Sequence, residues 1–413
     1  MSELSYLEKL LDGVEVEWLP LAKVCRLING RAYKQEELLS KGKYPVLRVG
    51  NFFTNQNWYY SDLELDQDKY CDNGDLLYAW SASFGPRIWH GGKSIYHYHI
   101  WKVVPDSNLI CKQFLYYLLQ WDTKALKDAH STGSTMMHIS KTTIEKRLVP
   151  IPCPDNPEKS LAIQSEIVRI LDKFTAITAE LTAELTMRKK QYNYYRDQLL
   201  SFDEEQEKPV YLEKLLDGVE VEWLPLGEVS ALRRGRVMSK GYLTENLGPY
   251  PVYSSQTANN GKIGSINTFD FDGEYISWTT DGANAGTVFY RTGKFSITNV
   301  CGLITLKSKY PLIYKFLFYW LTIEAKKHVY SGMGNPKLMS HQVENIPVPI
   351  PCPGNPEKSL AIQSEIVRIL DKFDTLTNSI TEGLPREIEL RQKQYEYYRD
   401  LLFSFPKPET ASN

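Results

Sequence analysis

The chain contains two nearly identical copies of its framing segments, which enclose two inserts of dissimilar sequence. The repeated pairs are Tyr6–Leu21 with Tyr211–Leu226, Val149–Phe174 with Val348–Phe373, and Lys190–Phe202 with Lys393–Phe405. The first pair is identical, and the second differs only where Asp155 is replaced by Gly354. The inserts, roughly residues 22–148 and 227–347, share only a faint pattern. This organisation predicts two binding domains carried on one internally symmetric frame.

The frame is dominated by two apolar heptad patterns. Apolar side chains recur at alternating steps of four and three from Ile163 to Leu181, and again from Ile362 to Ile380. Each pattern predicts a helix of about 40 residues, or ~60 Å. Two equivalent helices related by a pseudo-two-fold axis pack antiparallel, so we predict an antiparallel coiled coil. A plain helical bundle with no spacer role is the alternative. Gly383 and Pro385 predict a kink or break in the second helix.

The inserts differ from the frame in composition, because Gly, Asn, Ser and aromatic residues alternate with short β-type runs. We predict two α+β domains built from twisted antiparallel strands, each with one helix and exposed polar loops. The expected strands are Tyr44–Val49, Asp75–Trp80, Tyr96–Val104, Tyr250–Ser254, Tyr275–Thr279, Lys294–Ile297 and Val300–Leu306, and the expected helices are Cys111–Lys127 and Ile313–Lys326.

Composition indicates a cytoplasmic protein with no membrane segment. The net charge is −2, no apolar run reaches the ~20 residues that span a bilayer, and the N-terminus lacks a signal-peptide pattern. The six cysteines form no C-x-x-C pair, so we interpret them as small buried apolar residues in a reducing compartment. The near-neutral charge argues against simple electrostatic binding of nucleic acid, although a local basic surface remains compatible with it.

The sequence offers no motif for covalent chemistry. Gly92-Lys93-Ser94 lacks the first glycine of a phosphate-binding loop, and Asn156-Pro157-Glu158 lacks the second proline and the aromatic residue of an amino-methyltransferase tetrad. Asp155 and Lys159 faintly resemble a nuclease signature, but the second copy has Gly354 at the first position. The histidines show no metal-ligand spacing; His97 and His99 are expected on one strand face. We therefore predict no catalytic and no metal-binding residues, with a cryptic metal-dependent nuclease as an alternative.

Several insert loops carry side chains suited to reading DNA. Asn and Gln pair with adenine edges, while Arg and Lys contact guanine or phosphate. Gly30-Arg31 matches Gly235-Arg236, and the segment from Trp80 is matched with the segment from Trp278. The residues predicted to bind DNA are Arg31, Lys34, Arg48, Asn51, Ser81, Ser83, Arg87, Ser131 and Ser134 in the first insert, and Arg233, Arg234, Arg236, Ser255, Gln256, Asn259, Asn260, Lys262, Thr279, Thr280, Asn284, Asn335 and Lys337 in the second.

The layout resembles the specificity subunits of type I restriction–modification enzymes, in particular the IC group. The resemblance covers nearly the whole chain and is carried by the duplicated VPIPCP-x-NPEKSLAIQSEIVRILDKF helices, the TAEL tandem at Thr178–Leu185, KQY-x-YYRD, and the second insert from Ser254 to Lys307. It implies two target recognition domains, 1–150 and 203–349, with frame repeats 6–21 and 211–226. It also implies spacer helices at 151–202 and 350–405 and a tail at 406–413.

The resemblance implies that this chain is a non-catalytic subunit that reads a split, asymmetric site in double-stranded DNA. Two methyltransferase subunits would dock on the helices and methylate adenine, and restriction subunits would add translocation and cleavage. S-adenosylmethionine, ATP and magnesium would then belong to those partners, with no cofactor in this chain. The expected docking residues are Trp18, Trp223, Tyr194, Tyr195, Arg196, Tyr397, Tyr398 and Arg399. A stand-alone two-domain DNA-binding protein or coiled-coil scaffold is the alternative.

The TAEL tandem predicts a molecular ruler. Four helical residues add ~6 Å and a net rotation of about 40°, whereas one base pair adds ~3.4 Å and about 35°. A further TAEL unit inserted after Leu185 should lengthen the unread spacer by about one base pair and leave both half-site sequences unchanged. Methylation mapping of the inserted variant measures this, and an unchanged spacer length would contradict it. The two domains should contact DNA about one turn apart, ~34–36 Å.

Overall fold

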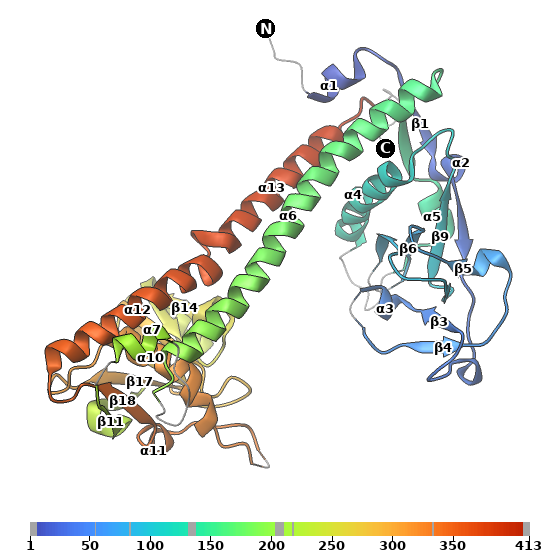
Figure 1. Cartoon of the computed structure of the whole chain (residues 1–413). Coiled ribbons are helices and arrows are strands. Elements are labelled where there is room, and N and C mark those ends of the chain that lie inside the picture. Colours follow the sequence, from blue (N-terminus) through green and yellow to red (C-terminus); the bar gives the residue numbers. More distant parts are fainter. Residues whose placement is uncertain are drawn as a thin grey trace, which may run out of the picture. The chain divides into compact units, whose positions relative to one another are not determined.

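The computed structural model describes residues 6–53, 55–81, 84–130, 138–202, 210–216, 219–332 and 334–407. It divides into two compact units (Figure 1). The first unit comprises Met1–Glu180 together with Glu389–Asn413, and the second comprises Leu181–Ile388. Each unit therefore combines segments from both sequence repeats, because the last residues of the chain belong to the first unit.

The first unit contains one antiparallel sheet and one mixed sheet of four strands each, and the helices that cover them. Its elements are α1 (Tyr6–Leu11), β1 (Val16–Pro20), α2 (Leu21–Val24), β2 (Cys25–Asn29), η1 (Gln35–Glu37), β3 (Tyr44–Leu47), α3 (Val49–Phe53), β4 (Tyr59–Ser61), η2 (Gln67–Lys69), β5 (Tyr70–Cys71), β6 (Leu76–Ala79), β7 (Gly85–Ile88), β8 (Ser94–Tyr96), β9 (Ile100–Pro105), α4 (Lys112–His130), α5 (Lys141–Glu145), β10 (Leu148–Pro152) and the first part of α6 (Pro157–Leu199).

Strand order in the first recognition domain is β2-β9-β6-β7 in one sheet and β4-β3-β8-β5 in the other. All pairs are antiparallel except β3 with β8, so the expectation of purely antiparallel strands is wrong at this point. Helix α4 packs against β7 and β9. The principal core lies there, with Tyr78 and Trp101 stacked at a centroid separation of 6.0 Å.

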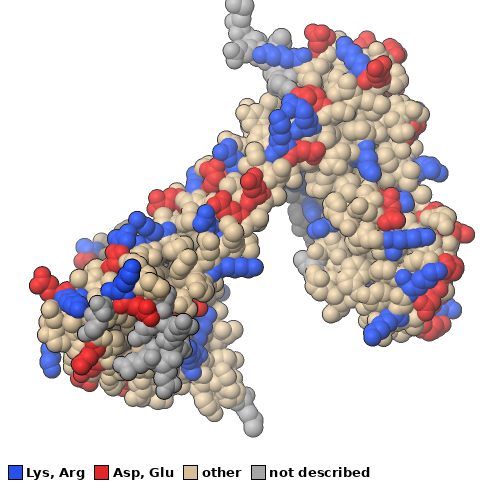
Figure 2. Space-filling view, in the orientation of Figure 1, with Lys and Arg blue, Asp and Glu red and all other residues tan. Residues whose placement is uncertain are grey.

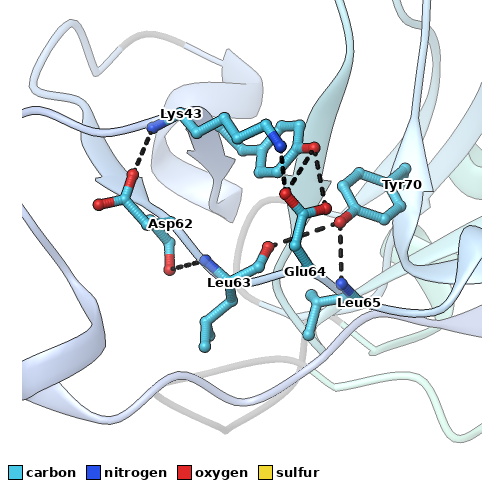
Figure 3. A network of polar contacts seen from close by, with 8 residues as sticks. Lys43, Asp62, Leu63, Glu64, Leu65 and Tyr70 are labelled. Carbon is cyan, nitrogen blue, oxygen red and sulfur yellow. Dashed lines mark hydrogen bonds and ion pairs between the residues drawn. The ribbon is translucent and has the colours of Figure 1, made fainter.

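A polar network fixes the loop that follows β4 (Figure 3). The backbone N–H of Lys43 donates to Asp62 Oδ1 at 2.7 Å, and the Lys43 ammonium hydrogen-bonds Glu64. Tyr70 Oη accepts from the Leu65 N–H at 2.9 Å. Hydrogen bonding to Lys43 lowers the pKa of the Glu64 carboxyl. These contacts fix residues 62–65, which follow β4, to Lys43 before β3 and to Tyr70 on β5.

The second unit repeats this plan with longer strands. Its elements are the last part of α6, α7 (Val210–Leu215), β11 (Val221–Pro225), α8 (Leu226–Val229), β12 (Ser230–Arg234), α9 (Lys240–Glu245), β13 (Leu247–Tyr253), η3 (Ala258–Gly261), β14 (Lys262–Ile266), β15 (Phe271–Thr279), β16 (Val288–Ile297), β17 (Cys301–Leu306), α10 (Tyr314–Glu324), η4 (Ala325–His328), α11 (Ser340–Val343), β18 (Pro347–Pro351), α12 (Pro356–Asn378) and the start of α13 (Gly383–Leu402).

One six-stranded sheet, ordered β12-β17-β15-β16-β13-β14, replaces the two sheets of the first unit. The long strand β16 pairs antiparallel with β15 and, at its end, parallel with β13. In the first unit β7 and β8 divide these two roles. Helix α10 packs on β15, β16 and α12, as α4 does on its own sheet. The predicted α+β architecture with an internal repeat is confirmed.

A two-stranded ribbon closes each frame. Strand β1 pairs with β10, and β11 pairs with β18, both antiparallel and in the same register. The sequence analysis did not predict these proline-containing strands, and the helices expected over 151–202 and 350–405 begin after them, at Pro157 and Pro356. Both strands of a two-stranded ribbon are edges, so Pro150 and Pro349 sit where a missing N–H is tolerated.

The long helices pair through aromatic side chains. Helix α6 runs uninterrupted for 43 residues, whereas its counterpart breaks between α12 and α13, as Gly383 and Pro385 predicted (Figure 1). In the first unit Phe174 stacks on Tyr398 with centroids 5.2 Å apart. In the second unit Tyr195 stacks on Phe373 at 5.5 Å. The later residue of α6 contacts the earlier residue of the other helix, so the pairing is antiparallel.

The heptad pattern serves two surfaces instead of one. Ile163 and Ile167 are buried in the core of the first domain, and Ile362 and Ile366 are buried in the second. Farther along the two patterns the side chains emerge, and Ile380 is 79% exposed. The beginning of each helix is therefore a structural part of its domain, and the aromatic residues that follow join the helices.

A buried glutamine ties each domain to its frame helix. Gln363 Oε1 accepts from the Ile313 N–H at 2.9 Å, and its Nε2 donates to the Pro311 carbonyl at 2.7 Å. Gln164 makes the same pair of bonds, with the Cys111 N–H and the Leu109 carbonyl. Both side chains are fully buried, so each satisfies two backbone groups that water does not reach.

Replacing Gln363 with Leu should leave that N–H and that carbonyl unpaired. Each orphaned buried group costs about 1–3 kcal/mol, so the free energy of unfolding should fall by about 2–4 kcal/mol. Gln392→Leu, on the exposed surface of α13, should change it by less than about 0.5 kcal/mol. Denaturant unfolding followed by circular dichroism measures both variants. Equal effects would show that the buried amide does not hold the domain on the helix.

Candidate nucleic-acid interface

The same tight crossing of two segments occurs in both domains. A Cβ on Gly30 would lie 2.2 Å from the Tyr96 carbonyl oxygen, and one on Gly235 would lie 2.2 Å from the Ile297 carbonyl oxygen. Parallel bridges join the next residues, Arg31 with His97 and Arg236 with Thr298. Only glycine permits so close a backbone approach. The Gly-Arg match in the sequence therefore marks one structural position, which places an arginine at the edge of each sheet.

A second segment reaches the same edge after β6 and after β15. Antiparallel bridges pair Ser81 with His138 in the first domain and Asp281 with Lys337 in the second. The N–H of Trp80 donates to the His99 carbonyl, and that of Thr280 donates to the Val300 carbonyl. Trp80 thus corresponds to Thr280, so the predicted match of Trp80 with Trp278 is wrong by two residues. Tyr78 is the buried counterpart of Trp278.

The third segment is a short turn that sequence reasoning missed. Residues 97–99 precede β9, and residues 298–300 precede β17. The alternation of His97 and His99 predicted that both lie on one strand face. The structure places them in this turn instead, so that prediction is wrong. Burial lowers the pKa of His97 to about 4 and also lowers that of His99, so both imidazoles are neutral at pH 7. No local pattern marks the turn, because its pairing partner lies far earlier in the chain.

The predicted residues of the first domain have different environments. Arg31 makes a bidentate ion pair with Glu37, at 3.0 and 2.7 Å, while Lys34 is exposed beside Glu36. Arg48 lies over the ring of Tyr59, and its buried Nε has no hydrogen-bond partner in the described structure. Asn51 donates to the Asn55 and Asn57 carbonyls, which shapes the loop after α3. Arg87 is exposed on β7, near the rings of Phe52 and Phe53.

The second domain presents a denser cationic edge. Arg233 and Arg234 are exposed at the end of β12, and Arg234 donates to the Asn299 carbonyl at 2.9 Å. Arg236 pairs with Asp270 at 3.0 Å, and its pKa is raised first by its hydrogen bond to Tyr242. Asn335 and Lys337 are exposed on the facing segment. Arg234 and Arg236 thus contact the turn at residues 298–300 directly.

The loop from Ser255 to Lys262 is a separate element of the second domain. Asn259, Asn260 and Lys262 are exposed, whereas Ser255 and Gln256 are half-buried. Gln256 Nε2 donates to the Lys262 carbonyl at 2.6 Å, which closes the loop on itself. Asn284 Nδ2 donates to the Ser255 carbonyl at 3.3 Å. The loop forms one wall of a cavity of about 1340 Å³, whose other wall includes Lys315 and the last turns of α12.

Several predicted residues are buried or lie outside the described residues. Ser81, Thr279 and Thr280 are 3%, 0% and 0% exposed, so the structure corrects their assignment as surface contacts. Thr279 instead hydrogen-bonds the Asn284 carbonyl and supports the loop beside it. Ser83, Ser131 and Ser134 lie outside the described residues.

The six cysteines differ in burial. Cys25, Cys71 and Cys301 are buried as expected, whereas Cys111, Cys153 and Cys352 are only half-buried.

The repeated YYRD motif is arranged alike in both units. Tyr194 and Tyr397 are 60% and 65% exposed, while the next tyrosine of each motif, Tyr195 or Tyr398, packs on the opposite helix. Arg399 is buried over Tyr395 and pairs with Asp400, so it is not a free contact residue as predicted.

The arginine of the other motif copy is in a similar position. Arg196 lies over Tyr192 and pairs with Asp197. Each arginine therefore stabilises its own helix, and the first tyrosine of each motif is the more exposed of the two.

The two framing tryptophans border different surroundings. Trp18 Nε1 donates to the Pro406 carbonyl at 2.7 Å, and Trp18 lines a cavity of about 740 Å³ together with Arg399 and Asp400. Trp223 is half-exposed, with its ring 5.5 Å from that of Trp320. The indole of Trp18 therefore lies near the end of α13, whereas that of Trp223 lies against α10.

Acidic and basic side chains are interspersed on the face shown in Figure 2, in agreement with the net charge of −2. Within the part of the chain that the structure describes, no group of three or more His, Cys, Asp or Glu side chains is arranged to hold a metal ion. None of the described helices is long and apolar enough to cross a membrane.

Comparison with known proteins identifies the family. The model of the type I restriction modification DNA specificity domain matches twice, at residues 14–187 and 218–390. The chain is 39% identical to the type I restriction enzyme EcoR124I/EcoR124II specificity subunit of Escherichia coli, over the full length of both proteins. It is 37% identical to the EcoprrI specificity subunit of Escherichia coli, over 92% of this chain and 93% of that protein.

Solved structures show the same fold. The specificity subunit of a type I restriction–modification system from M. genitalium aligns with a TM-score of 0.55 at 17% identity, covering 96% of this chain and 98% of its own. A chain from a study of complex assembly in the type I system also aligns with a TM-score of 0.55, at 14% identity, covering 94% and 97%. With two matched domains and a full-length relative, this chain belongs to the family of type I restriction–modification DNA specificity subunits.

Proposed function

We propose that this chain is the non-catalytic specificity subunit that gives a type I complex its bipartite DNA site, with each recognition domain reading one half. The observation that carries the proposal is the repeated edge. Arg31 and Arg236 occupy one structural position, Ser81 and Asp281 a second, and the turns at 97–99 and 298–300 a third. Equivalent backbone positions that present different side chains are what two unlike half-sites require, because base contacts carry the sequence information.

The helices and framing strands are proposed to set the spacer and to dock two methyltransferase subunits. Tyr194 in the second unit and Tyr397 in the first are exposed at equivalent positions, and Trp223 and Trp18 are the corresponding indoles. Exposed aromatic side chains at fixed positions favour partner binding. Methyl transfer to adenine would then belong to those partners, together with S-adenosylmethionine. ATP and magnesium would belong to the restriction subunits.

Co-expression with a type I methyltransferase subunit tests this division of labour. We expect two partner subunits per chain, and adenine methylation by the assembled complex but not by the isolated chain. Tyr194→Ala and Tyr397→Ala should each lower the stoichiometry from two partners to one, whereas Tyr60→Ala, on β4 of the first recognition domain, should not. Mass measurement of the purified complexes reads the stoichiometry. A chain that binds DNA specifically but recruits no partner would support the stand-alone alternative, and methylation or cleavage by the isolated chain would refute the proposal.

The exposed amide of Asn260 should contribute to reading the second half-site. Asn260→Ala should cost about 1–3 kcal/mol of discrimination at one base pair if the amide contacts a base. Asn260→Gly should do the same, because glycine retains the left-handed backbone while removing the side chain. Gln256→Ala tests the loop closure as well as the contact, since its amide bonds the Lys262 carbonyl.

Binding measured against a panel of single-base variants of both half-sites distinguishes the outcomes. The loss should be confined to the second half-site. An equal loss on all DNA sequences would mark a phosphate contact. No measurable loss from any of the three variants would move base reading to another part of the domain, with the turn at 298–300 as the next segment to test.

A further inference from the structure

A buried cation lies beneath the Ser255–Lys262 loop. Arg291, on β16, is 3% exposed, and in the described structure no carboxylate lies within ion-pair distance of it. Its Nε donates to Ser277 Oγ at 3.0 Å, and its Nη1 donates to the Asn260 carbonyl oxygen at 2.8 Å. A buried charge is costly unless other interactions compensate it. An arginine retained here without a carboxylate therefore requires a structural explanation.

Aromatic rings provide the rest of the environment of Arg291. The guanidinium carbon lies 3.6 Å from the centroid of Tyr253 and 4.5 Å from that of Phe289. Cation–π attraction strengthens when the cation is desolvated. Burial lowers the pKa of Arg291 to about 10, which still leaves the group charged at neutral pH. The planar guanidinium is thus held by two rings and aims a hydrogen bond at the loop backbone.

The loop that receives this bond has an unusual conformation. Asn259, Asn260 and Gly261 have φ values of 49°, 54° and 83° in succession. Consecutive left-handed residues other than glycine are strained and persist only where surrounding contacts hold them. A Cβ on Gly261 would lie 3.0 Å from Arg291 Nη2. Arg291 therefore packs directly against the strained turn and bonds the carbonyl at its centre.

The strand position of Arg291 holds a different residue in the first domain. Strand pairing places Trp89 at the position of Arg291, since Trp89 N–H bonds the Asp75 carbonyl while Arg291 is paired with Tyr275. Trp89 packs on Trp58 and donates its indole N–H to the Gly92 carbonyl. An arginine at this strand position is thus a feature of the second domain, where the loop carries two exposed asparagines.

We propose that Arg291 is a positioning residue that locks the Ser255–Lys262 loop in the conformation that reads the second half-site. This inference rests on the proposed function of the second domain. Arg291 acts through the backbone of Asn260 and does not contact DNA itself. A loop held in its binding conformation before DNA arrives loses less conformational freedom on binding, which improves both affinity and discrimination. A loop released from Arg291 would present the same amides in many orientations.

Arg291→Gln in the assembled complex tests the lock. Methylation kinetics are measured on the cognate site and on sites with one base changed in either half. We expect discrimination at the second half-site to fall about fivefold or more, and discrimination at the first half-site to stay within about twofold. Arg291→Lys should fall in between, because an ammonium keeps the charge near the rings but lacks the planar fork. Hydrogen exchange at the amides of residues 259–262 should accelerate in Arg291→Gln.

Gly261→Ala provides an independent route if Arg291→Gln does not fold. Its Cβ meets Arg291 Nη2 and disfavours the left-handed backbone, so it should reproduce the selective loss with the arginine intact. Wild-type discrimination in a folded Arg291→Gln or Gly261→Ala complex would overturn the inference, and so would an equal loss at both half-sites. If the wild-type complex itself ignores the second half-site, the proposed function of the domain fails instead.

Discussion

The exchange of helix ends between the two sequence repeats is the interaction on which the rest of the structure depends. Leu402, Phe403 and Phe405, from the end of the chain, complete the core of the first unit, where Phe403 packs on Phe114 at 5.9 Å. Leu199, Leu200 and Phe202, from the end of α6, complete the second, where Phe202 packs on Phe316 at 5.9 Å. Neither recognition domain is closed by its own repeat alone.

This exchange explains why the frame is duplicated so closely while the inserts diverge. The first residues of each long frame helix pack in the core of one domain, and its last residues pack in the core of the other. A change in one copy would have to preserve the buried Gln164 or Gln363 cap, the aromatic stacking and the closing phenylalanines together. The inserts make none of these frame contacts and share only the glycine crossings, so their loops can differ without changing the structure of the frame.

Sequence reasoning found the parts of the structure that are encoded locally or by repetition. The heptad helices, the break at Gly383, the central strands and the helix of each insert follow from periodicity and from backbone constraints. The matched Gly30 and Gly235 were found because the repeat preserved them. The strands that contain Pro150 and Pro349 were not predicted; each has one unpaired side, where the missing N–H of proline is tolerated.

The details of the candidate site depend on tertiary pairing. The two-residue shift between Trp80 and Thr280 follows from bridges to His138 and Lys337, which no local pattern reveals. The burial of Thr279 and the position of Arg291 under a loop thirty residues earlier also arise only when strands assemble. Loop composition pointed to one end of each domain but could not separate side chains that face solvent from those that support the loop.

The central claim is that two equivalent frame segments carry two recognition domains that read DNA independently. It is tested most directly by replacing residues 227–347 with a second copy of residues 22–148, assembling the complex and mapping the methylated adenines. The account predicts that the asymmetric site becomes an inverted repeat of the first half-site, because both frame segments then carry the same recognition domain. An unchanged asymmetric site, or a folded and assembled complex with no sequence preference, would contradict it.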